Sequence, residues 1–168
     1  MEKIFATRLA YLANTADLLH GSQIGGRKQR SAIDAALLLL NEVQTQKEAR
    51  KYKSSTVTST LFLDIKGAFD YVSKPRLLLI LAKLGLPGNL SRWVLSYLSD
   101  RKIQLAFDNR IQPDPVRIDI GIPQGSPISP ILFLLYVRDI VTEKAFQLSY
   151  IDDFCIAVTS NSVRKNCA

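Results

Sequence analysis

Apolar positions recur along the chain with two different periods, and the change of period separates predicted helices from predicted strands. A spacing of three or four residues predicts helices over residues 1–20, 31–47, 75–84, 90–98 and 126–141. Short alternating or continuous apolar runs predict strands over residues 61–64, 103–107, 116–120, 146–150 and 154–158. The resulting order is helix, helix, strand, helix, helix, hairpin, helix, hairpin. This order predicts an α+β domain in which helices cover an antiparallel sheet.

Local signals support several of these helix boundaries. Ser31 is followed three residues later by Asp34, which is the pattern of a capping box. Pro75 suits the first turn of a helix, where a missing N–H costs little. Gly21 and Gly85 lie where two of the helices are expected to end.

Two of the predicted strands end in carboxylates. The run Leu61–Leu63 has the character of a strand buried on both faces, and Asp64 follows it at the rim of the sheet. Asp152 and Asp153 follow the strand at 146–150, and Asp152 lies 88 positions after Asp64. If these strands are neighbours, three mutually repelling carboxylates meet in a small volume, where Mg²⁺ would neutralise them. Two such ions about 3.5–4 Å apart clamp both oxygens of a phosphoryl transfer. Taken alone, a pair of aspartates after a strand is more often a turn.

Composition and charge narrow the class of protein. The chain has 168 residues, of which 47% are hydrophobic, enough for one globular domain with a core. The net charge of +7 favours an anionic partner, with nucleic acid as the leading candidate. Two cysteines are too few for a disulfide scaffold and fit a reducing compartment. The sequence shows neither a secretory pattern nor an apolar run of transmembrane length, so no membrane partner is expected.

Three segments carry polar or conformational signals that regular structure does not explain. Residues 21–30 form a Gly-rich and strongly basic loop. Residues 47–53 are rich in Lys and Arg and are expected to form an exposed loop that attracts nucleic acid without reading its sequence. Residues 121–127 contain two prolines and two glycines, which impose an unusual backbone path.

Four segments, taken in order, resemble the motifs of one enzyme family. They are residues 23–34, residues 62–70 (FLDIKGAFD), residues 121–130 (GIPQGSPISP) and residues 150–153 (YIDD). Together they resemble the reverse transcriptase family, specifically the polymerase domain of non-LTR (LINE-type) retrotransposons, and most of all those of filamentous fungi. Ile151 stands where many relatives carry alanine. The likeness covers nearly the whole chain. A group II intron maturase or a telomerase-like polymerase is the alternative lineage.

The resemblance implies a metal site and a reaction. Asp64 and Asp152 would bind two Mg²⁺ ions, for which Mn²⁺ could substitute, and the backbone carbonyl of Ile65 would assist. Asp153 would complete the catalytic triad with a weaker direct role. The reaction would join a dNTP to a primer 3′-hydroxyl and release pyrophosphate.

The resemblance also implies contacts with the incoming nucleotide. Phe69 would exclude ribonucleotides as an aromatic steric gate, because the 2′-hydroxyl is what distinguishes them. Gln124 and Gly125 would lie beside the nucleotide and the template. The plainer alternatives are a core aromatic for Phe69 and a structural turn for Gln124 and Gly125.

Three basic side chains are further candidates for the nucleotide site. Arg27 and Arg30 would reach the triphosphate, for which the planar donor fork of arginine is suited. Lys66 would touch the template or the nucleotide. The alternatives are a solvated basic loop for Arg27 and Arg30, and a plain surface charge for Lys66.

The resemblance finally predicts the organisation of the chain and its partners. Residues 1–55 would be a partial fingers region and residues 56–168 a palm truncated after its third catalytic motif (residues 150–153), with the thumb absent. The predicted function is that of an RNA-directed DNA polymerase fragment acting on an RNA template, a DNA primer and dNTPs. The alternatives are a catalytically inactive nucleic-acid-binding remnant and a fragment that does not fold. The expected location is the nucleus, with the mitochondrion as an alternative, and the sequence predicts no oligomeric state.

Overall fold

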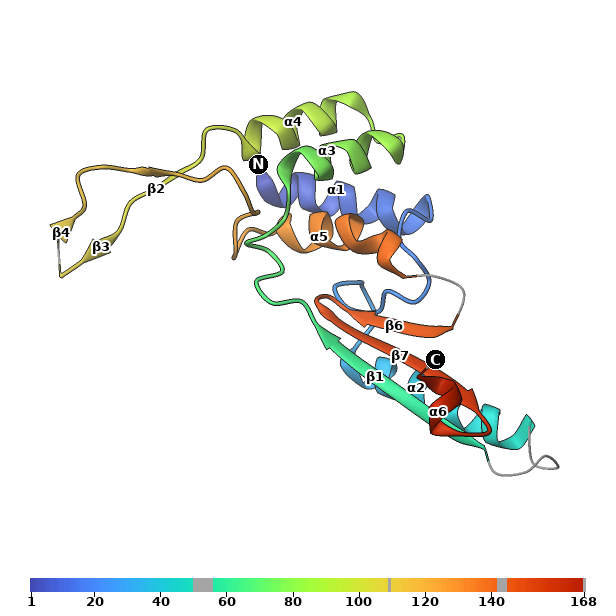
Figure 1. The fold of residues 1–168 in the computed structure, drawn as a ribbon. Coiled ribbons are helices and arrows are strands. Elements are labelled where there is room, and N and C mark those ends of the chain that lie inside the picture. The colour runs from blue at the N-terminus through green and yellow to red at the C-terminus, as the bar shows by residue number, and fades with distance from the viewer. Residues whose placement is uncertain (50–55, 109, 142–144, 168) are drawn as a thin grey trace. The chain divides into compact units, whose positions relative to one another are not determined.

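The computed structural model describes residues 1–49, 56–108, 110–141 and 145–167 (Figure 1). Its elements are, in order, α1 (Glu2–Thr15), α2 (Ala32–Ala49), β1 (Val57–Asp64), α3 (Lys74–Lys83), α4 (Gly88–Leu98), β2 (Lys102–Ile103), β3 (Ala106–Phe107), β4 (Arg110–Ile111), β5 (Val116–Arg117), α5 (Ser129–Val137), the 3₁₀ helix η1 (Arg138–Ile140), β6 (Phe146–Tyr150), β7 (Asp153–Ser160) and α6 (Val163–Asn166). The predicted α+β class and the predicted order of helices, strand and hairpins are confirmed, and η1 and α6 are additions.

The chain forms two compact units, each built from separated stretches of sequence. Unit 1 contains Met1–Tyr11 and Gly67–Tyr136, and unit 2 contains Leu12–Lys66 and Val137–Ala168. The expected division into fingers and palm at residue 55 stays a prediction, and residues 50–55 lie outside the described part of the chain. Residues 47–49 of the expected basic loop belong to α2 instead, and residues 50–53 lie outside the described part of the chain.

The core of unit 1 is helical. α3 buries Leu77 and Leu81, and α4 buries one side that carries Leu90, Val94 and Leu98. This side of α4 was expected from the spacing of its apolar residues. α5 is different, because its residues from Ile131 to Leu135 are all buried, so the helix has no solvent face. None of the described helices is both long and apolar enough to cross a membrane.

The predicted helix boundaries are confirmed where a capping interaction sets them. Ser31 and Asp34 bond reciprocally at the start of α2, from the amide of Asp34 to Ser31 Oγ (3.2 Å) and from the amide of Ser31 to Asp34 Oδ2 (2.6 Å). At the end of α3, Gly85 has a left-handed backbone (φ +67°), and its amide donates to the carbonyl of Ala82. This is the geometry in which glycine ends a helix with least strain.

α1 is shorter than its apolar spacing predicted. It ends at Thr15 rather than near Gly21, because Asp17 adopts a left-handed backbone (φ +52°) and turns the chain. Leu19 continues the apolar spacing and is buried, but from the following loop and not from the helix. The spacing therefore identified inward-facing positions correctly and placed the helix end wrongly.

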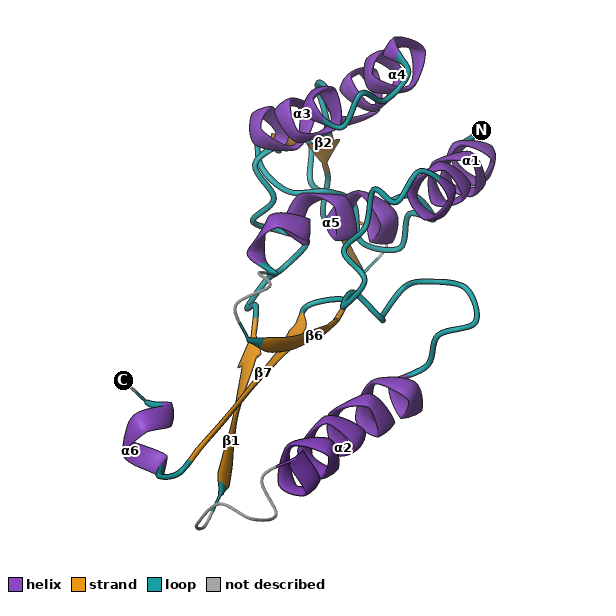
Figure 2. Cartoon of the chain, turned by 90° about the vertical axis from the view of Figure 1, so that its right-hand side faces the viewer, coloured by secondary structure: helices purple, strands orange, loops and turns teal. Residues whose placement is uncertain are grey.

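Unit 2 is built on a three-stranded antiparallel sheet in the order β1-β7-β6. β1 pairs with β7 over eight residues, from Val57 opposite Ser160 to Asp64 opposite Asp153. α2 lies against β6 and β7, and α6 lies against β1 and β7 (Figure 2). An isolated parallel bridge between Gln23 and Ser149 adds one loop residue to the free edge of β6.

The expectation that Leu61–Leu63 is buried on both faces is wrong. The side chains of Leu61, Phe62 and Leu63 are 54%, 68% and 47% exposed. Because successive side chains of a strand point to opposite faces, exposure at all three positions means that neither face of this end of β1, an edge strand of the sheet, is covered by the described residues. An apolar run of this kind is typical of a central strand, and the sequence pattern alone cannot tell a central strand from an edge strand.

The predicted hairpin of residues 103–120 forms, but it is not half-buried. Its two ladders are short, β2 with β5 and β3 with β4, and every residue in them is exposed. Each ladder is a separate two-stranded sheet, and the exposure of its side chains means that no described element packs over its faces. Phe107 pairs with Arg110 where the turn was expected, and Asn109 lies outside the described residues.

Two boundaries near the predicted motifs also differ. α5 begins at Ser129 rather than 126 and continues as η1 to Ile140. The tight turn between β6 and β7 consists of Ile151 and Asp152, because Asp153 already pairs with Tyr150. Asp153 is therefore a strand residue, whereas the sequence had suggested a turn made by the two aspartates.

Candidate active site

The three predicted acids lie at one end of the unit 2 sheet. Asp64 is the last residue of β1, Asp153 is the first of β7, and the two are direct cross-strand partners. Cross-strand partners project their side chains on the same face of a sheet, about 4.5–5.5 Å apart at Cβ. The amide of Ile65 donates to the backbone carbonyl of Asp152 (3.2 Å), which fixes the turn to the end of β1. Folding thus brings together acids that are far apart in sequence.

The turn that carries Asp152 has an unusual backbone. Tyr150 and Asp153 pair across it, so Ile151 and Asp152 form a two-residue hairpin loop. Ile151 has φ +60°, whereas Asp152 is not among the residues with positive φ. A positive φ at the first loop position alone fits a type II′ turn, where glycine is usual. A β-branched residue in this conformation persists only when the surrounding contacts hold it there.

The carboxylates themselves are available to a ligand. In the described residues, no ion pair or side-chain hydrogen bond engages Asp64, Asp152 or Asp153. Across the same residues, no three His, Cys, Asp or Glu side chains are arranged to hold a metal ion. The acids therefore share one end of the sheet without forming a closed three-carboxylate site. Their oxygens and the nearby Ile65 carbonyl are the hard donors that Mg²⁺ prefers.

The basic residues of unit 2 that are predicted to contact the nucleotide differ in their surroundings, because Arg27 is half-buried and the others are exposed. Arg27 is anchored in its own loop, where Nε donates to Asn14 Oδ1 (3.0 Å) and a terminal nitrogen donates to the carbonyls of His20 (3.4 Å) and Gln23 (3.3 Å). Arg30 is exposed, like Lys66. The nucleotide-binding roles of these three side chains stay predictions.

Arg30 also lines a cavity of about 410 Å³ at the start of α2. The other lining residues are Gln29, Asp34, Leu37, Leu38 and Asn41. Hydrogen bonds from the Ser31 hydroxyl and amide lower the pKa of Asp34, so this carboxylate stays charged at lower pH than usual. The cavity therefore combines one anion, one cation and two leucines.

In unit 1, the loop that begins at Gly121 is bonded to the turn that follows β1. The amide of Gly121 donates to the carbonyl of Val72 (2.8 Å), and the amide of Ile122 donates to the carbonyl of Phe69 (2.9 Å). Gly121 has φ +85°, and a Cβ there would lie 2.7 Å from the carbonyl oxygen of Asp70. The two predicted motifs of this unit are thus held together by backbone contacts that require glycine.

The residues of unit 1 that are predicted to contact the nucleotide lie in these two segments, the turn after β1 and the loop that begins at Gly121. Phe69 is half-buried and stacks on the buried Phe133, with ring centroids 5.1 Å apart. Gln124 is exposed and donates from Nε2 to Asp70 Oδ1 (3.0 Å), and Gly125 is exposed beside it. The stacking supports a structural role for Phe69 and leaves its role as a gate a prediction.

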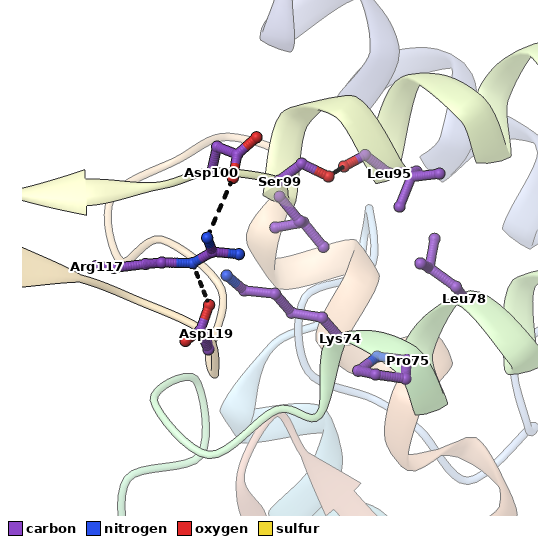
Figure 3. A pocket seen from close by; sticks show the side chains of 9 residues that line it. Lys74, Pro75, Leu78, Leu95, Ser99, Asp100, Arg117 and Asp119 are labelled. Carbon is purple, nitrogen blue, oxygen red and sulfur yellow. Dashed lines mark hydrogen bonds and ion pairs between the residues drawn. The ribbon is translucent and has the colours of Figure 1, made fainter.

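Unit 1 also has a cavity of about 360 Å³ that no predicted site residue lines (Figure 3). Arg117 lies between two carboxylates, with Nε 2.8 Å from Asp119 and a terminal nitrogen 3.6 Å from Asp100. Lys74 Nζ donates to the carbonyl of Ile118 (2.6 Å), and burial lowers the pKa of this lysine. Pro75 and the leucines of α3 and α4 form the apolar part of the lining. Because the two cations and two anions balance, the cavity has no evident charge preference.

Comparison with known proteins decides the family. The sequence model of the family described as reverse transcriptase (RNA-dependent DNA polymerase) matches residues 1–168. The chain belongs to the reverse transcriptase family. The four motifs that suggested this family therefore identified it correctly.

Relatives of this reverse transcriptase chain are polymerases of mobile elements. It is 27% identical over 165 residues to a probable RNA-directed DNA polymerase from transposon X-element of Drosophila melanogaster, covering 95% of this chain and 17% of the relative. It is 28% identical to the RNA-directed DNA polymerase from mobile element jockey of the same organism, covering 97% and 18%. It is 29% identical to a Pol polyprotein from type-1 retrotransposable element R2 of Popillia japonica, covering 79% and 17%.

These relatives confirm the predicted non-LTR retrotransposon lineage. The likeness to fungal elements stays a prediction. The chain spans less than a fifth of the length of these relatives.

Two solved telomerase structures share the fold. Apo telomerase from Candida tropicalis, truncated from its C-terminal domain, superimposes with a TM-score of 0.64 at 15% identity, covering 99% of this reverse transcriptase chain and 35% of the other. Telomerase from Candida albicans in complex with a TWJ fragment of telomeric RNA gives a TM-score of 0.56 at 12% identity, covering 94% and 30%. At such identity the likeness concerns the fold alone, and it confirms the predicted reverse-transcriptase-type palm fold.

One set of contacts beside the acids was not predicted, although it involves the segment 23–34 that the sequence reasoning had singled out. Ser22, Ile24 and Gly25 bond to Ser149, the strand residue two positions before the turn of the reverse transcriptase YIDD motif. The signal that could have found them was the pair Gly25-Gly26, because adjacent glycines often mark a close approach of two backbones. Which backbone approaches them could not be read from the sequence.

Proposed function

We propose that this chain carries the catalytic centre of an RNA-directed DNA polymerase, which extends a DNA primer on an RNA template by nucleotidyl transfer from dNTPs. The observation that supports this most is the cross-strand pairing of Asp64 with Asp153 in the β1–β7 ladder. Beside this pair, the backbone carbonyl of Asp152 accepts a hydrogen bond from the amide of Ile65. The chain belongs to the reverse transcriptase family, and these acids lie in the segments 62–70 and 150–153 that resemble its catalytic motifs. The proposal extends to RNA, primer and dNTP as substrates.

The donor set fits divalent magnesium. Asp64, Asp152 and the Ile65 carbonyl would hold the ions, and Asp153 would contribute from the adjacent strand position. Two bound Mg²⁺ ions would lower the pKa of the primer hydroxyl and neutralise the triphosphate, and Mn²⁺ could replace them. The task of the protein is then to hold carboxylate oxygens at one end of a rigid sheet, in spite of their repulsion.

Other residues would select and orient the nucleotide. Phe69 would act as the gate against a 2′-hydroxyl, and Gln124 with Gly125 would lie beside the base pair. Arg27, Arg30 and Lys66 would supply positive charge to the triphosphate or the template. The loop hydrogen bonds of Arg27 use Nε and one terminal nitrogen, so its other terminal nitrogen would be the donor to a phosphate oxygen.

The same proposal also covers the regions of the chain, its affinity for nucleic acid and its location in the cell. Residues 1–55 would belong to the fingers and residues 56–168 to the palm. The net charge of +7 would contribute to template and primer affinity, which should fall as salt rises. Copying of a mobile element would take place in the nucleus, and imaging of a tagged chain tests that location against the mitochondrion.

The decisive experiment is primer extension by the purified chain on a primed RNA template, with dNTPs and either Mg²⁺ or Mn²⁺. The wild type should extend the primer, and Asp152→Asn should reduce the rate by at least about 10³-fold. Asp114→Asn, in the exposed loop of the hairpin, is the matched control and should leave the rate unchanged. Salt-dependent RNA binding without extension by the wild type would instead support a non-catalytic nucleic-acid-binding remnant.

A further inference from the structure

We propose that Gly25 is a positioning residue for the catalytic turn, because its missing side chain lets residues 22–25 lie directly on the backbone that carries Asp152. This inference rests on the proposed polymerase function and adds to it a residue to which the family motifs assign no such role. We call residues 22–25 the clasp segment. All of its contacts described here lie within unit 2.

The clasp segment is bonded to the end of β6 through the backbone. The amide of Ser149 donates to the carbonyl of Ser22 (2.9 Å), and the amide of Ile24 donates to the carbonyl of Ser149 (2.8 Å). The amide of Gly25 donates to the same carbonyl (3.3 Å). Because Ser149 lies two residues before Ile151, these bonds fix the point from which the catalytic turn departs.

Gly25 is the residue at which this approach is closest. It is buried, and a Cβ built on it would lie 2.5 Å from the amide nitrogen of Ile151 and 2.7 Å from the Cα and carbonyl carbon of Tyr150. All three neighbours are backbone atoms, so no side-chain rotation could relieve the clash. Gly25 has no positive φ, so the requirement for glycine at this position is purely steric. Any larger residue must move either the clasp segment or the turn.

The turn formed by Ile151 and Asp152 is held by the clasp segment on one side and by the end of β1 on the other, and its strained backbone needs both contacts. The clasp segment contacts its first half, and the bond from Ile65 N–H to the Asp152 carbonyl holds its second half to β1. Between them, Ile151 has the left-handed backbone that a β-branched residue adopts only under constraint. Displacement at Gly25 should therefore pass through the turn to Asp152 and to its bond with Ile65.

The clasp segment is itself held in place by polar contacts that the catalytic chemistry does not use. The amide of Ser22 donates to His20 Nδ1 (3.2 Å), and the amide of His20 donates to Gln23 Oε1 (2.9 Å). Gln23 is fully buried. His20, to which sequence reasoning assigned no role, thus acts as a local acceptor that shapes the loop.

The test compares Gly25→Ala with Gly21→Ala in the full chain. Gly21 lies in the same loop, has no positive φ, and has open space where a Cβ would point, so its alanine variant is a matched control. Hydrogen exchange of the Ile65 amide reports whether the turn stays docked on β1, at a strand remote in sequence from the substitution. We expect Gly25→Ala to speed this exchange by about tenfold or more, and Gly21→Ala to change it by less than about twofold.

Kinetics give the second readout. If the wild type is active, Gly25→Ala should lower kcat by about 10- to 100-fold and change the KM for primer–template by less than about threefold, because a small misplacement of reacting groups slows chemistry more than binding. Should Gly25→Ala fail to melt cooperatively, His20→Ala loosens the same segment and should speed Ile65 exchange in the same direction. An unchanged Ile65 exchange rate in the folded variant would overturn the inference. If the wild type is inactive but Gly25→Ala still speeds Ile65 exchange, the polymerase proposal fails and the positioning role of Gly25 stands.

Discussion

Asp64 and Asp153 are cross-strand partners at the end of the β1–β7 ladder. Two carboxylates in this arrangement oppose folding, because like charges directly opposite each other in a sheet destabilise it. No cationic side chain among the described residues forms an ion pair with either of them. A pair of this kind is expected at a functional site, where binding of a cation offsets the repulsion. The proposed metal site can therefore be tested through the free energy of unfolding with and without metal, independently of catalysis.

Replacing Asp153 should therefore stabilise the chain when no metal is present. We expect Asp153→Asn to raise the free energy of unfolding by about 0.2–1 kcal/mol in a chelating buffer, because it removes the cross-strand repulsion. Addition of Mg²⁺ should stabilise the wild type more than the variant. Urea unfolding with and without Mg²⁺ measures both effects, with Asp114→Asn as a control that should show neither. Equal Mg²⁺ responses in wild type and Asp153→Asn would argue against a metal ion at this pair.

The exposed apolar side chains of β1 should contribute little to stability. Phe62 is 68% exposed, whereas Phe154 on the neighbouring strand is 7% exposed. Phe62→Thr should cost less than about 1 kcal/mol, and Phe154→Ala about 3–5 kcal/mol. Chemical denaturation of both variants gives the comparison. A cost for Phe62→Thr that equals the cost at Phe154 would show that this side chain is covered in solution.

Gly121 should tolerate no side chain, because it combines a left-handed backbone with a close approach to Asp70. Gly121→Ala is expected to cost more than about 1–2 kcal/mol, the usual penalty of a left-handed conformation, since the steric clash adds to it. Gly88 begins α4 with open space around it, so Gly88→Ala should be neutral or slightly stabilising. Thermal unfolding of the two variants measures the difference, and similar melting temperatures would contradict the backbone contact between the two motifs.

The capping box at the start of α2 should make stability depend on pH. The pKa of Asp34 lies below its ordinary value of 3.8, because the Ser31 hydroxyl and amide donate to the carboxylate. The folded state then binds fewer protons at this group than the unfolded chain does, so its contribution is present above pH 3.8 and is lost as pH falls through the lower folded pKa. Unfolding measured from pH 5 to pH 2 should show a smaller loss for Asp34→Asn than for the wild type. Parallel profiles would mean that the box does not form in solution.

Local patterns predicted much of this protein, because they depend on neighbours in sequence. The capping of α2 by Ser31 and Asp34, the end of α3 at Gly85 and the inward side of α4 all follow from contacts within one or two turns. The reverse transcriptase motifs and their acids could likewise be recognised from residue type and order. Residue type and order are therefore sufficient to identify the family.

Only the tertiary structure decided which of these local elements meet. It put β1 at the edge of the sheet and left the side chains of Leu61–Leu63 exposed on both faces. It also paired Asp64 with Asp153, while Ile151 and Asp152 form the turn. It also brought Gly25 onto the backbone of Ile151. Strand order and backbone approach depend on partners far away in the chain, and periodicity carries no information about them. A sequence therefore determines what each segment can become, whereas long-range pairing decides what each side chain faces.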